Sequence, residues 1–229
     1  EDVLQNSRIV PGGPFSSSVY TINNANNTTY ISPGSIDEIW NRRYQFDGIF
    51  AYKDFEWTHY SSEDLGAGDI VAVSQDPSNP NTIWANAWGT GILEVVDGKT
   101  ETLYNHLNTN GALKGVLNSN ESDIRTGGLT FDDNGILWAT NSLTEKPLIK
   151  RDRQGNWTSY GFGSLSSGSI AFKDILINDL GQIWMQTRLT GFVVVEFFNG
   201  QAVGRGFRAS VGNGNLPEDQ VLSMAEDLD

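Results

Sequence analysis

The stretches "FDDNGILWAT", residues 131–140, and "INDLGQIWMQ", residues 177–186, share one pattern, a Gly placed three residues before a Trp. The same turn occurs with a short insertion in "SQDPSNPNTIWAN" (74–86) and, with Tyr30 in place of Trp, in "INNANNTTYIS" (22–32). Asp, Asn and Gly between two apolar runs are typical of a β-hairpin turn. We therefore expect four hairpins, each returning with an aromatic residue that points into the core.

Two more strands are predicted after each hairpin. The third strands are "GIFAYK" (48–53), "GILEVV" (91–96), "PLIKRD" (147–152) and "GFVVVEF" (191–197). The fourth strands are "EWTHY" (56–60), "TETLY" (100–104), "NWTSY" (156–160) and, more weakly, "QAVGRGF" (201–207). Four-stranded antiparallel units that recur about every 45–55 residues predict the blades of a β-propeller. A β-sandwich with four similar hairpins is the alternative.

The predicted organisation is all-β, with four blades at about 17–62, 68–107, 124–162 and 170–209. Residues 1–16 would be a lead or linker segment, and residues 219–229 the first strand of a fifth blade. In that alignment Asp227, Leu228 and Asp229 match the turn residues Asp132, Asp133 and Asn134. The stretch "DEIWNRRYQF" (37–46) lies in a loop of the first unit and could form one turn of helix.

Composition narrows the function. The 229 residues carry a formal net charge of −13 with a pI of about 4.4. A nucleic-acid partner is not expected, because phosphate binding needs a surplus of Lys and Arg. The chain has no Cys and no run of 18 apolar residues, so we expect neither disulfides nor a membrane-spanning helix.

The residue pattern of the repeats resembles that of a known family. The stretches "NLPEDQVLSMAEDLD" (215–229), "DDNGILWAT" and "NDLGQIWMQT" are similar to the two-component-regulator propeller repeat, typical of surface and periplasmic proteins of Bacteroidetes. Residues 8–60 combine a Gly-Gly-Pro lead, a "YISPG" hairpin and a Gly-Ile strand ending in Trp-x-x-Tyr. This combination resembles the PorZ-like propeller components of the type IX secretion system.

The resemblance implies two seven-bladed propellers and a C-terminal domain. It also implies a place at the cell surface, in a complex that attaches secreted cargo to lipopolysaccharide. Because 229 residues supply about four blades, we expect the chain to be a fragment of a longer protein.

No motif points to catalysis, a metal or a cofactor. His59 and His106 lie in different units without His-x-His spacing, and a metal site needs three or four convergent ligands. No Gly-x-Ser-x-Gly elbow occurs, and "GSLSSG" (163–168) reads as a turn between blades. The acids Glu63, Asp64 and Glu101 are not distinguished from solvated carboxylates. We therefore predict a protein that is not an enzyme.

Aromatic and cationic residues in loops are the candidates for binding. In a propeller, the loops between second and third strands share one face with the loops between blades. On that face we place Trp40, Arg42, Arg43, Tyr44, Trp88 and Arg188. Trp and Tyr stack on sugars or anchor protein interfaces, and Arg pairs with carboxylates or phosphates. Alternatively, Trp40 and Trp88 fold back onto their own blades.

The predicted function is that of a surface scaffold. It would bind other secretion-system surface proteins or lipopolysaccharide, at the outer membrane or in the periplasm of a Gram-negative bacterium. An alternative is the periplasmic oligosaccharide-sensing ectodomain of a hybrid two-component regulator. A third hypothesis, a polysaccharide or antibiotic lyase, predicts a cluster of His, Glu and Arg at the mouth of the channel.

Overall fold

The structure is a computed structural model that describes residues 13–226. Strands dominate these residues, together with one turn of α-helix, α1 (Ser62–Leu65), and one turn of 3-10 helix, η1 (Gly163–Ser166). The strands are β1 (Thr21–Ala25), β2 (Thr28–Ser32), β3 (Ile49–Lys53), β4 (Glu56–Tyr60), β5 (Ile70–Gln75), β6 (Thr82–Gly89), β7 (Gly91–Val96), β8 (Lys99–Tyr104), β9 (Ile124–Phe131), β10 (Leu137–Asn141), β11 (Leu148–Arg151), β12 (Trp157–Tyr160), β13 (Phe172–Ile177), β14 (Ile183–Thr187), β15 (Phe192–Phe198) and β16 (Gln201–Phe207).

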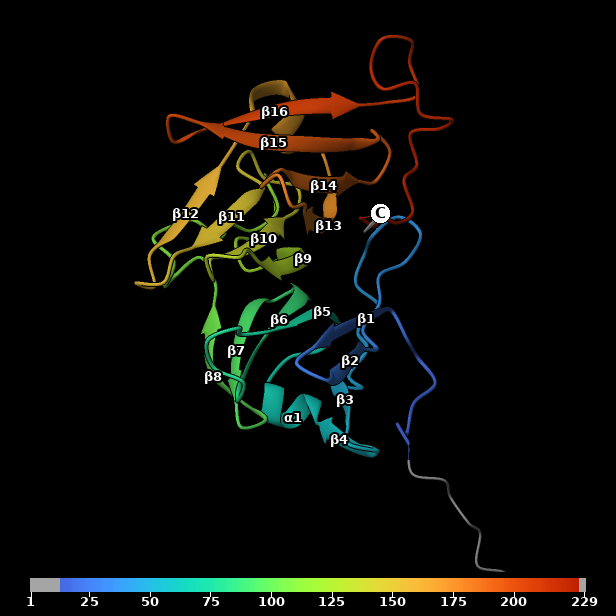
Figure 1. Ribbon diagram of the computed structural model, residues 1–229, viewed down its shortest axis with the longest axis vertical. Coiled ribbons are helices and arrows are strands. Elements are labelled where there is room, and N and C mark those ends of the chain that lie inside the picture. Colours follow the sequence, from blue (N-terminus) through green and yellow to red (C-terminus); the bar gives the residue numbers. More distant parts are fainter. Residues whose placement is uncertain (1–12, 227–229) are drawn as a thin grey trace, which may run out of the picture.

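The strands form four antiparallel units, each pairing its members in chain order: β1–β4, β5–β8, β9–β12 and β13–β16. A short ladder from Trp88 and Gly89 in β6 to β9 joins the second unit to the third. Figure 1 shows the first two units in the lower half of the view and the last two in the upper half. The fold is that of a β-propeller, and these units are its blades 1 to 4, which confirms the predicted fold class.

The repeated Asp/Asn-Gly turn has a direct physical basis. In blade 3, Asp132 Oδ1 accepts the backbone N–H groups of Asn134 and Ile136, both at 2.9 Å. Gly135 follows with a φ of 68°, a left-handed conformation that glycine adopts without steric cost. In blade 4, Asn178 accepts from the equivalent backbone groups two and four residues later. A side-chain acceptor followed by Gly therefore turns both hairpins in the same way.

The repeat aromatic residue of each of the first three blades packs between its own blade and the next. Tyr30 lies in the core between blades 1 and 2, Trp84 between blades 2 and 3, and Trp138 between blades 3 and 4. Trp84 is 1% exposed and Trp138 6%. Burying a side chain of this size is worth about 3 kcal/mol or more, so these cores provide much of the cohesion between blades.

A polar residue two positions after each Trp ties its blade to the next segment. Asn86 Nδ2 donates to two carbonyl oxygens of β9, those of Gly127 at 3.0 Å and Gly128 at 2.8 Å. Thr140 donates to the carbonyl oxygen of Lys173 in β13. These bonds satisfy buried backbone acceptors and fix the height of one blade against its neighbour.

The third member of this set reaches the C-terminal segment. Gln186 Nε2 donates to the carbonyl oxygen of Val221, and Gly191 N donates to that of Asp219 at 2.8 Å. Residues 219–226 thus run beside blade 4 but form no strand. That 219–229 opens a fifth blade remains a prediction, because residues 227–229 lie outside those described. Residues 1–12 of the predicted lead segment lie outside them too.

One local expectation needs correction, and two others become more precise. Residues 37–46 form no helical turn, because Asp37 caps a tight turn instead, accepting the backbone N–H groups of Ile39 and Asn41. The fourth strand predicted at 201–207 is confirmed as β16, which pairs with β15 along all seven of its residues. The Ser/Gly stretch at 163–168 contains η1.

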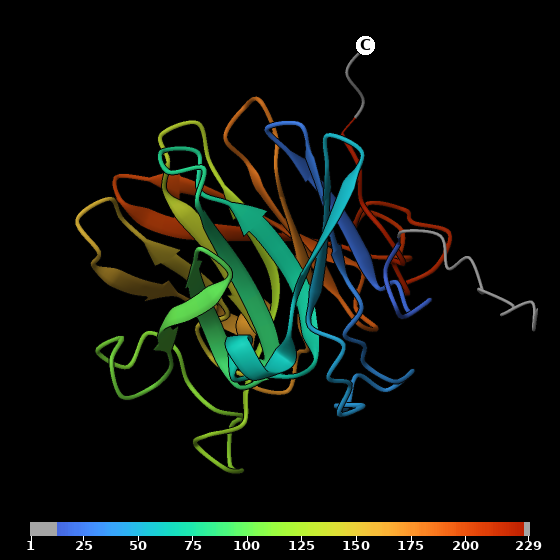
Figure 2. The same cartoon turned by 90° about the horizontal axis from the view of Figure 1, so that it is seen from below.

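The blades have two distinct ends. The turns that join the first strand of each blade to its second gather at one end, here named the turn end, along the upper edge of Figure 2. The longer loops that join β2 to β3 and successive blades gather at the other, here named the loop end. No helix among residues 13–226 is long and apolar enough to cross a membrane.

Candidate functional site

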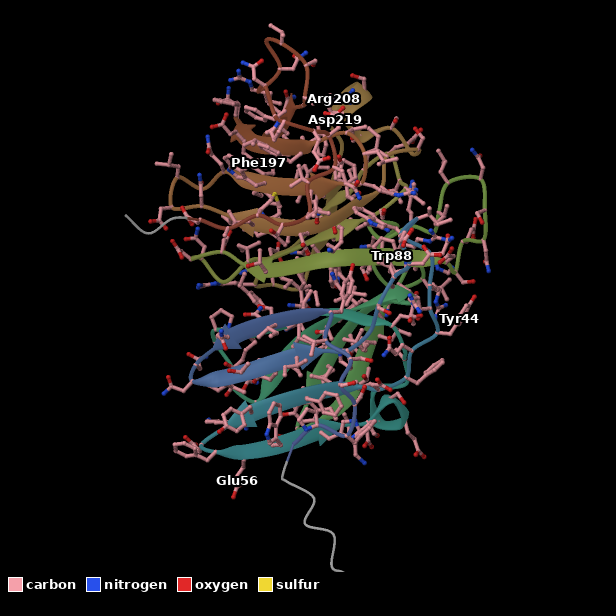
Figure 3. The ribbon with its side chains drawn as sticks, turned by 90° about the vertical axis from the view of Figure 1, so that its right-hand side faces the viewer. Tyr44, Glu56, Trp88, Phe197, Arg208 and Asp219 are labelled. Atoms are coloured by element: carbon pink, nitrogen blue, oxygen red, sulfur yellow. The ribbon has the colours of Figure 1, made fainter. Side chains whose placement is uncertain are left out.

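The loop end brings the six predicted binding residues into one region. Trp40, Trp88 and Arg188 line one pocket, and Arg42 and Tyr44 line a second. Arg43 and Tyr44 line a third. In Figure 3, Trp88 and Tyr44 lie at the loop end, whereas Glu56 and Phe197 lie toward the turn end. The three pockets share or neighbour the 39–45 loop, so they form a continuous surface.

The first of these, here named the central pocket, has a volume of about 260 Å³. Its walls come from four loops and are mostly apolar, with two guanidinium groups among them. The lining residues are Ile39, Trp40, Trp88, Arg125, Leu143, Ser169, Ile170, Ala171, Arg188, Leu189 and Thr190. A small concave site with an apolar body and a few polar groups is the usual form of a ligand pocket.

Trp88 forms the floor of the central pocket. Its side chain is fully buried, and its Nε1 donates to the carbonyl oxygen of Trp40 at 3.1 Å. The Trp40 ring stands edge-on to the Trp88 ring, with centroids 6.3 Å apart. Trp88 therefore folds back onto the protein, as in the alternative considered for it, and the half-buried Trp40 is the ring that a ligand can reach.

A buried carboxylate holds the loop that carries Trp40. Asp69, which is 0% exposed, accepts Arg42 Nε at 3.2 Å and the backbone N–H groups of Tyr44 at 3.1 Å and Gln45 at 2.9 Å. The Arg42 guanidinium also lies over the Tyr44 ring, 4.9 Å from its centroid. Arg42 is therefore committed to the fold of the loop, because a buried carboxylate requires a charged partner.

Asp37 fixes the preceding turn. Hydrogen bonds from the backbone of Asn41, followed by those from Ile39 and the Asn41 side chain, hold the pKa of Asp37 below its usual value. The charged form is favoured because these donors bond to the carboxylate. Trp40 follows with a φ of 63°, an unusual conformation for a non-glycine residue that this turn maintains.

Arg125 belongs to the site although the sequence did not single it out. Its guanidinium pairs with Asp123, Nη2 to Oδ2 at 3.1 Å, and Nη1 donates to the carbonyl oxygen of Trp40 at 3.3 Å. It is the second residue of β9, just after the long loop between blades 2 and 3. Its place after an inter-blade loop is the signal that could have found it.

Arg188 differs from the other arginines of the central pocket. It is half-buried, and its Nε is buried without a hydrogen-bond partner. Among residues 13–226 its guanidinium forms no ion pair, whereas those of Arg42 and Arg125 both do. An unpaired guanidinium beside an apolar wall can donate hydrogen bonds to a carboxylate or phosphate group of a ligand.

Burial also changes an ionisable group beside the pocket. Tyr20 packs against the cluster of Ile36, Val71 and Trp88, and Lys173 Nζ lies 4.9 Å from the centre of its ring. Burial, with a smaller contribution from the nearby Asp174, raises the pKa of Tyr20 well above its ordinary value. Tyr20 therefore stays neutral at physiological pH and acts as part of the pocket support.

The remaining residues considered for chemistry lie elsewhere. His59 stacks on Phe50 in blade 1 with centroids 5.0 Å apart, and its Nε2 lies 2.9 Å from the carbonyl oxygen of Asp47. Glu63 and Asp64 occupy the first turn of α1. In the described part of the chain, no three His, Cys, Asp or Glu side chains are grouped so that they could hold a metal ion.

Comparisons with known proteins identify the fold class. No protein-family model matches the sequence, and no curated protein matches it. Among solved structures, PorZ, described as an essential surface component of the type IX secretion system of Porphyromonas gingivalis, is 22% identical with a TM-score of 0.70. The match covers 82% of this chain and 26% of PorZ.

Two other propellers are similar at lower identity. The extracellular domain of BT4673 from B. thetaiotaomicron, described as a one-component system, is 15% identical with a TM-score of 0.62, over 93% of this chain and 25% of that one. A streptogramin B lyase is 14% identical with a TM-score of 0.57, over 86% of this chain and 57% of the lyase. The chain thus has the propeller fold and spans about a quarter of PorZ and of BT4673.

Proposed function

We propose that this chain is a non-enzymatic binding propeller whose central pocket receives an anionic group from a surface partner. The observation that carries the proposal is Arg188, a half-buried guanidinium whose Nε has no acceptor, at the end of an apolar pocket. A phosphate or carboxylate would supply that acceptor, and Trp40 would pack against the group that bears it.

The partner that we propose is lipopolysaccharide or a surface protein of a type IX secretion system. Similarity to PorZ supports this choice, although at 22% identity it carries the fold alone. In a chain of net charge −13, four arginines line the loop-end pockets: Arg42, Arg43, Arg125 and Arg188. Asp69 pairs with Arg42 and Asp123 with Arg125, so Arg43 and Arg188 are the cations without an ion pair among the described residues that can attract an anionic partner to that face. In this proposal the protein acts at the cell surface or in the periplasm.

The test is binding to lipopolysaccharide before and after enzymatic removal of its phosphate groups. We expect Arg188→Gln to weaken binding of the phosphorylated form about tenfold, because a charge-assisted pair is worth roughly 1.5–3 kcal/mol when buried and less when half-exposed. Arg205→Gln is the matched control, since Arg205 lies over Phe207 on blade 4, away from the pocket.

Two results would contradict the proposal. One is equal affinity for the phosphorylated and dephosphorylated forms, and the other is equal weakening by the Arg188 and Arg205 substitutions. If lipopolysaccharide does not bind at all, binding to surface proteins of a type IX secretion system tests the protein arm with the same pair of variants. Lack of an Arg188 effect there also contradicts the central-pocket assignment.

An oligosaccharide-sensing ectodomain is the second candidate. Its support is the similarity to the extracellular domain of BT4673, which extends over 93% of this chain. This candidate predicts binding of neutral oligosaccharides that Arg188→Gln leaves unchanged. The streptogramin B lyase has the same fold, so the fold does not separate binding from catalysis. Turnover of a polysaccharide or a streptogramin by the purified chain would overturn the non-enzymatic assignment.

A further inference from the structure

A second hollow lies at the turn end, between blades 2 and 3. It has a volume of about 660 Å³, within the range of small-molecule sites. One wall is the β5–β6 turn, the other is the β9–β10 turn, and β11 with its following turn contributes two arginines. The lining residues are Asp76, Pro77, Ser78, Phe131, Asp132, Asp133, Gly135, Leu137, Arg151 and Arg153. We name this hollow the turn-end groove.

An aromatic box holds the first of these arginines. The Arg151 guanidinium carbon lies 4.7 Å from the ring centre of Trp84, 5.7 Å from that of Tyr104 and 5.9 Å from that of Trp157. Contact with three rings fixes the guanidinium in place without neutralising its charge. Arg151 Nε is buried and has no hydrogen-bond partner.

No carboxylate neutralises the groove arginines. Among the described residues, neither Arg151 nor Arg153 forms an ion pair, although three aspartates line the same groove. Arg153 lies over the β9–β10 turn and close to Gly135. A side chain at position 135 would bring its Cβ within 3.1 Å of Arg153 Nη2. Two guanidinium groups thus have donors to offer a ligand.

The aspartates divide into committed and free groups. Asp132 accepts three hydrogen bonds, from two backbone N–H groups and from Trp138 Nε1 at 2.9 Å. Asp76 Oδ1 accepts the backbone N–H and the hydroxyl of Ser78. Asp76 Oδ2 and the exposed Asp133 accept no hydrogen bond from any described residue. The groove therefore offers free acceptors as well as free donors.

These groups define the ligand by its charges. A simple anion would be repelled by the three carboxylates, and a simple cation would be repelled by the two guanidinium groups. A molecule with one charge of each sign satisfies both sets, and the half-buried Phe131 and buried Leu137 can pack against an apolar side chain. We propose that the turn-end groove binds a zwitterion of amino-acid size, its carboxylate on Arg151 and Arg153 and its ammonium on Asp76 or Asp133.

In the experiment, the full chain is titrated with three related probes, and binding is measured by NMR. L-phenylalanine carries both charges, its amide lacks the carboxylate, and N-acetyl-L-phenylalanine lacks the ammonium. We expect phenylalanine to bind and each single-charge derivative to bind at least tenfold more weakly. Arg153→Gln should weaken the binding of phenylalanine and leave the affinity for the amide unchanged. Asp133→Asn should weaken the binding of phenylalanine and leave the affinity for the N-acetyl derivative unchanged.

The controls separate this site from the central pocket. Asp179→Asn is the matched control, because Asp179 holds the same turn position in blade 4 as Asp133 in blade 3. Arg188→Gln should leave phenylalanine binding unchanged. Because Arg153 and Asp133 are exposed, both variants are expected to fold. The proposal is overturned if phenylalanine does not bind, if the three probes bind equally, or if a neutral disaccharide such as maltose displaces phenylalanine.

Discussion

The interface between blades 2 and 3 and the one between blades 3 and 4 place a Trp from the same repeat position in different surroundings. Trp84 lies against Tyr104, with centroids 5.5 Å apart, and against the Arg151 guanidinium, while its Nε1 has no partner. Trp138 lies 5.5 Å from the Phe197 ring and donates its Nε1 to Asp132 at 2.9 Å. Both indoles lie beside a cation, because Lys150 Nζ is 5.6 Å from the ring centre of Trp138. The interfaces differ in that the Trp138 indole is hydrogen-bonded, whereas the Trp84 indole has no partner among the described residues.

The difference shows what a repeat can and cannot specify. The returning strand places the indole at the blade interface in both cases, although the turns before it differ. Asp76 accepts from Ser78 in blade 2, and Asp132 accepts from Asn134 and Ile136 in blade 3. The residues that meet the indole come from both blades: Tyr104 belongs to the same blade as Trp84, whereas Arg151 and Trp157 come from the following one. The turn-end groove borders the interface between blades 2 and 3, where Arg151 lies over Trp84.

Loss of the indole should have the largest effect at both interfaces. We expect Trp84→Ala and Trp138→Ala each to lower the free energy of unfolding by about 3–5 kcal/mol, the usual cost of a large buried cavity. Chemical denaturation measures this. Trp57→Ala is the control, because Trp57 is half-buried on the outer strand β4 and should cost roughly 1–2 kcal/mol. A loss at Trp84 or Trp138 no larger than at Trp57 would contradict this account of the interfaces.

The side-chain acceptor of the turn should contribute more to stability in blade 3 than in blade 4. Asp132→Ala removes the acceptor of two backbone N–H groups and of the buried Trp138 Nε1, so we expect a loss of about 2–3 kcal/mol. Asn178→Ala removes backbone acceptance in the equivalent turn and should cost about 1 kcal/mol. Denaturant midpoints of the two variants give the comparison, and equal losses would mean that the indole bond adds nothing.

The two interface tyrosines offer a smaller contrast. Tyr104 donates its hydroxyl to Glu94 Oε2 at 2.8 Å in the interface between blades 2 and 3. Tyr104→Phe should cost about 1 kcal/mol, since the bond is charge-assisted but only half-buried. The Tyr160 hydroxyl makes no hydrogen bond to the described residues, so Tyr160→Phe should change stability by less than about 0.5 kcal/mol. Thermal unfolding of both variants tests the order.

Alkaline pH should weaken both interfaces slightly. Burial raises the pKa of Tyr104, with a further contribution from Glu94, and burial alone raises that of Tyr160. The unfolded chain therefore releases these protons first, near pH 10, and stability should fall as the pH rises from about 10 toward the folded-state values. Tyrosinate absorbance in the folded and denatured chain measures the shift. If the tyrosines ionise at the same pH in the folded and the denatured chain, the buried environment inferred for these phenols is wrong.

Much of the fold was readable from the sequence because the repeat is local. A side-chain acceptor, a Gly and a Trp within seven residues encode a hairpin, and the hairpin spacing encodes a blade. Residues 37–46 were misread because the Asp37 side chain caps a turn, and a capping hydrogen bond competes with helix formation. The strength of β16 was underestimated because its Gly residues lower strand propensity, whereas pairing along its whole length with β15 decides its structure.

The candidate site was predicted in part. Loop position was enough to place Trp40 and Arg188 at one end of the blades, since all loops of one kind share a face. Trp88 lies at that end too, but within β6 and not in a loop. The sequence did not show that Trp88 is fully buried, that Arg42 pairs with Asp69, or that Arg125 completes the central pocket. Each of these facts depends on a contact between residues far apart in the chain.

The sequence by itself determined the blades, their order and the aromatic residue that each of the first three presents to its neighbour, because those features follow from hydrogen bonds and hydrophobic burial within a few residues. Only the tertiary structure decided which charges are neutralised. Asp69 pairs with Arg42 and Asp123 with Arg125, whereas Arg151, Arg153 and Arg188 form no ion pair among the described residues. Charge pairing depends on which loops and blades meet in space, and a local repeat leaves that unspecified.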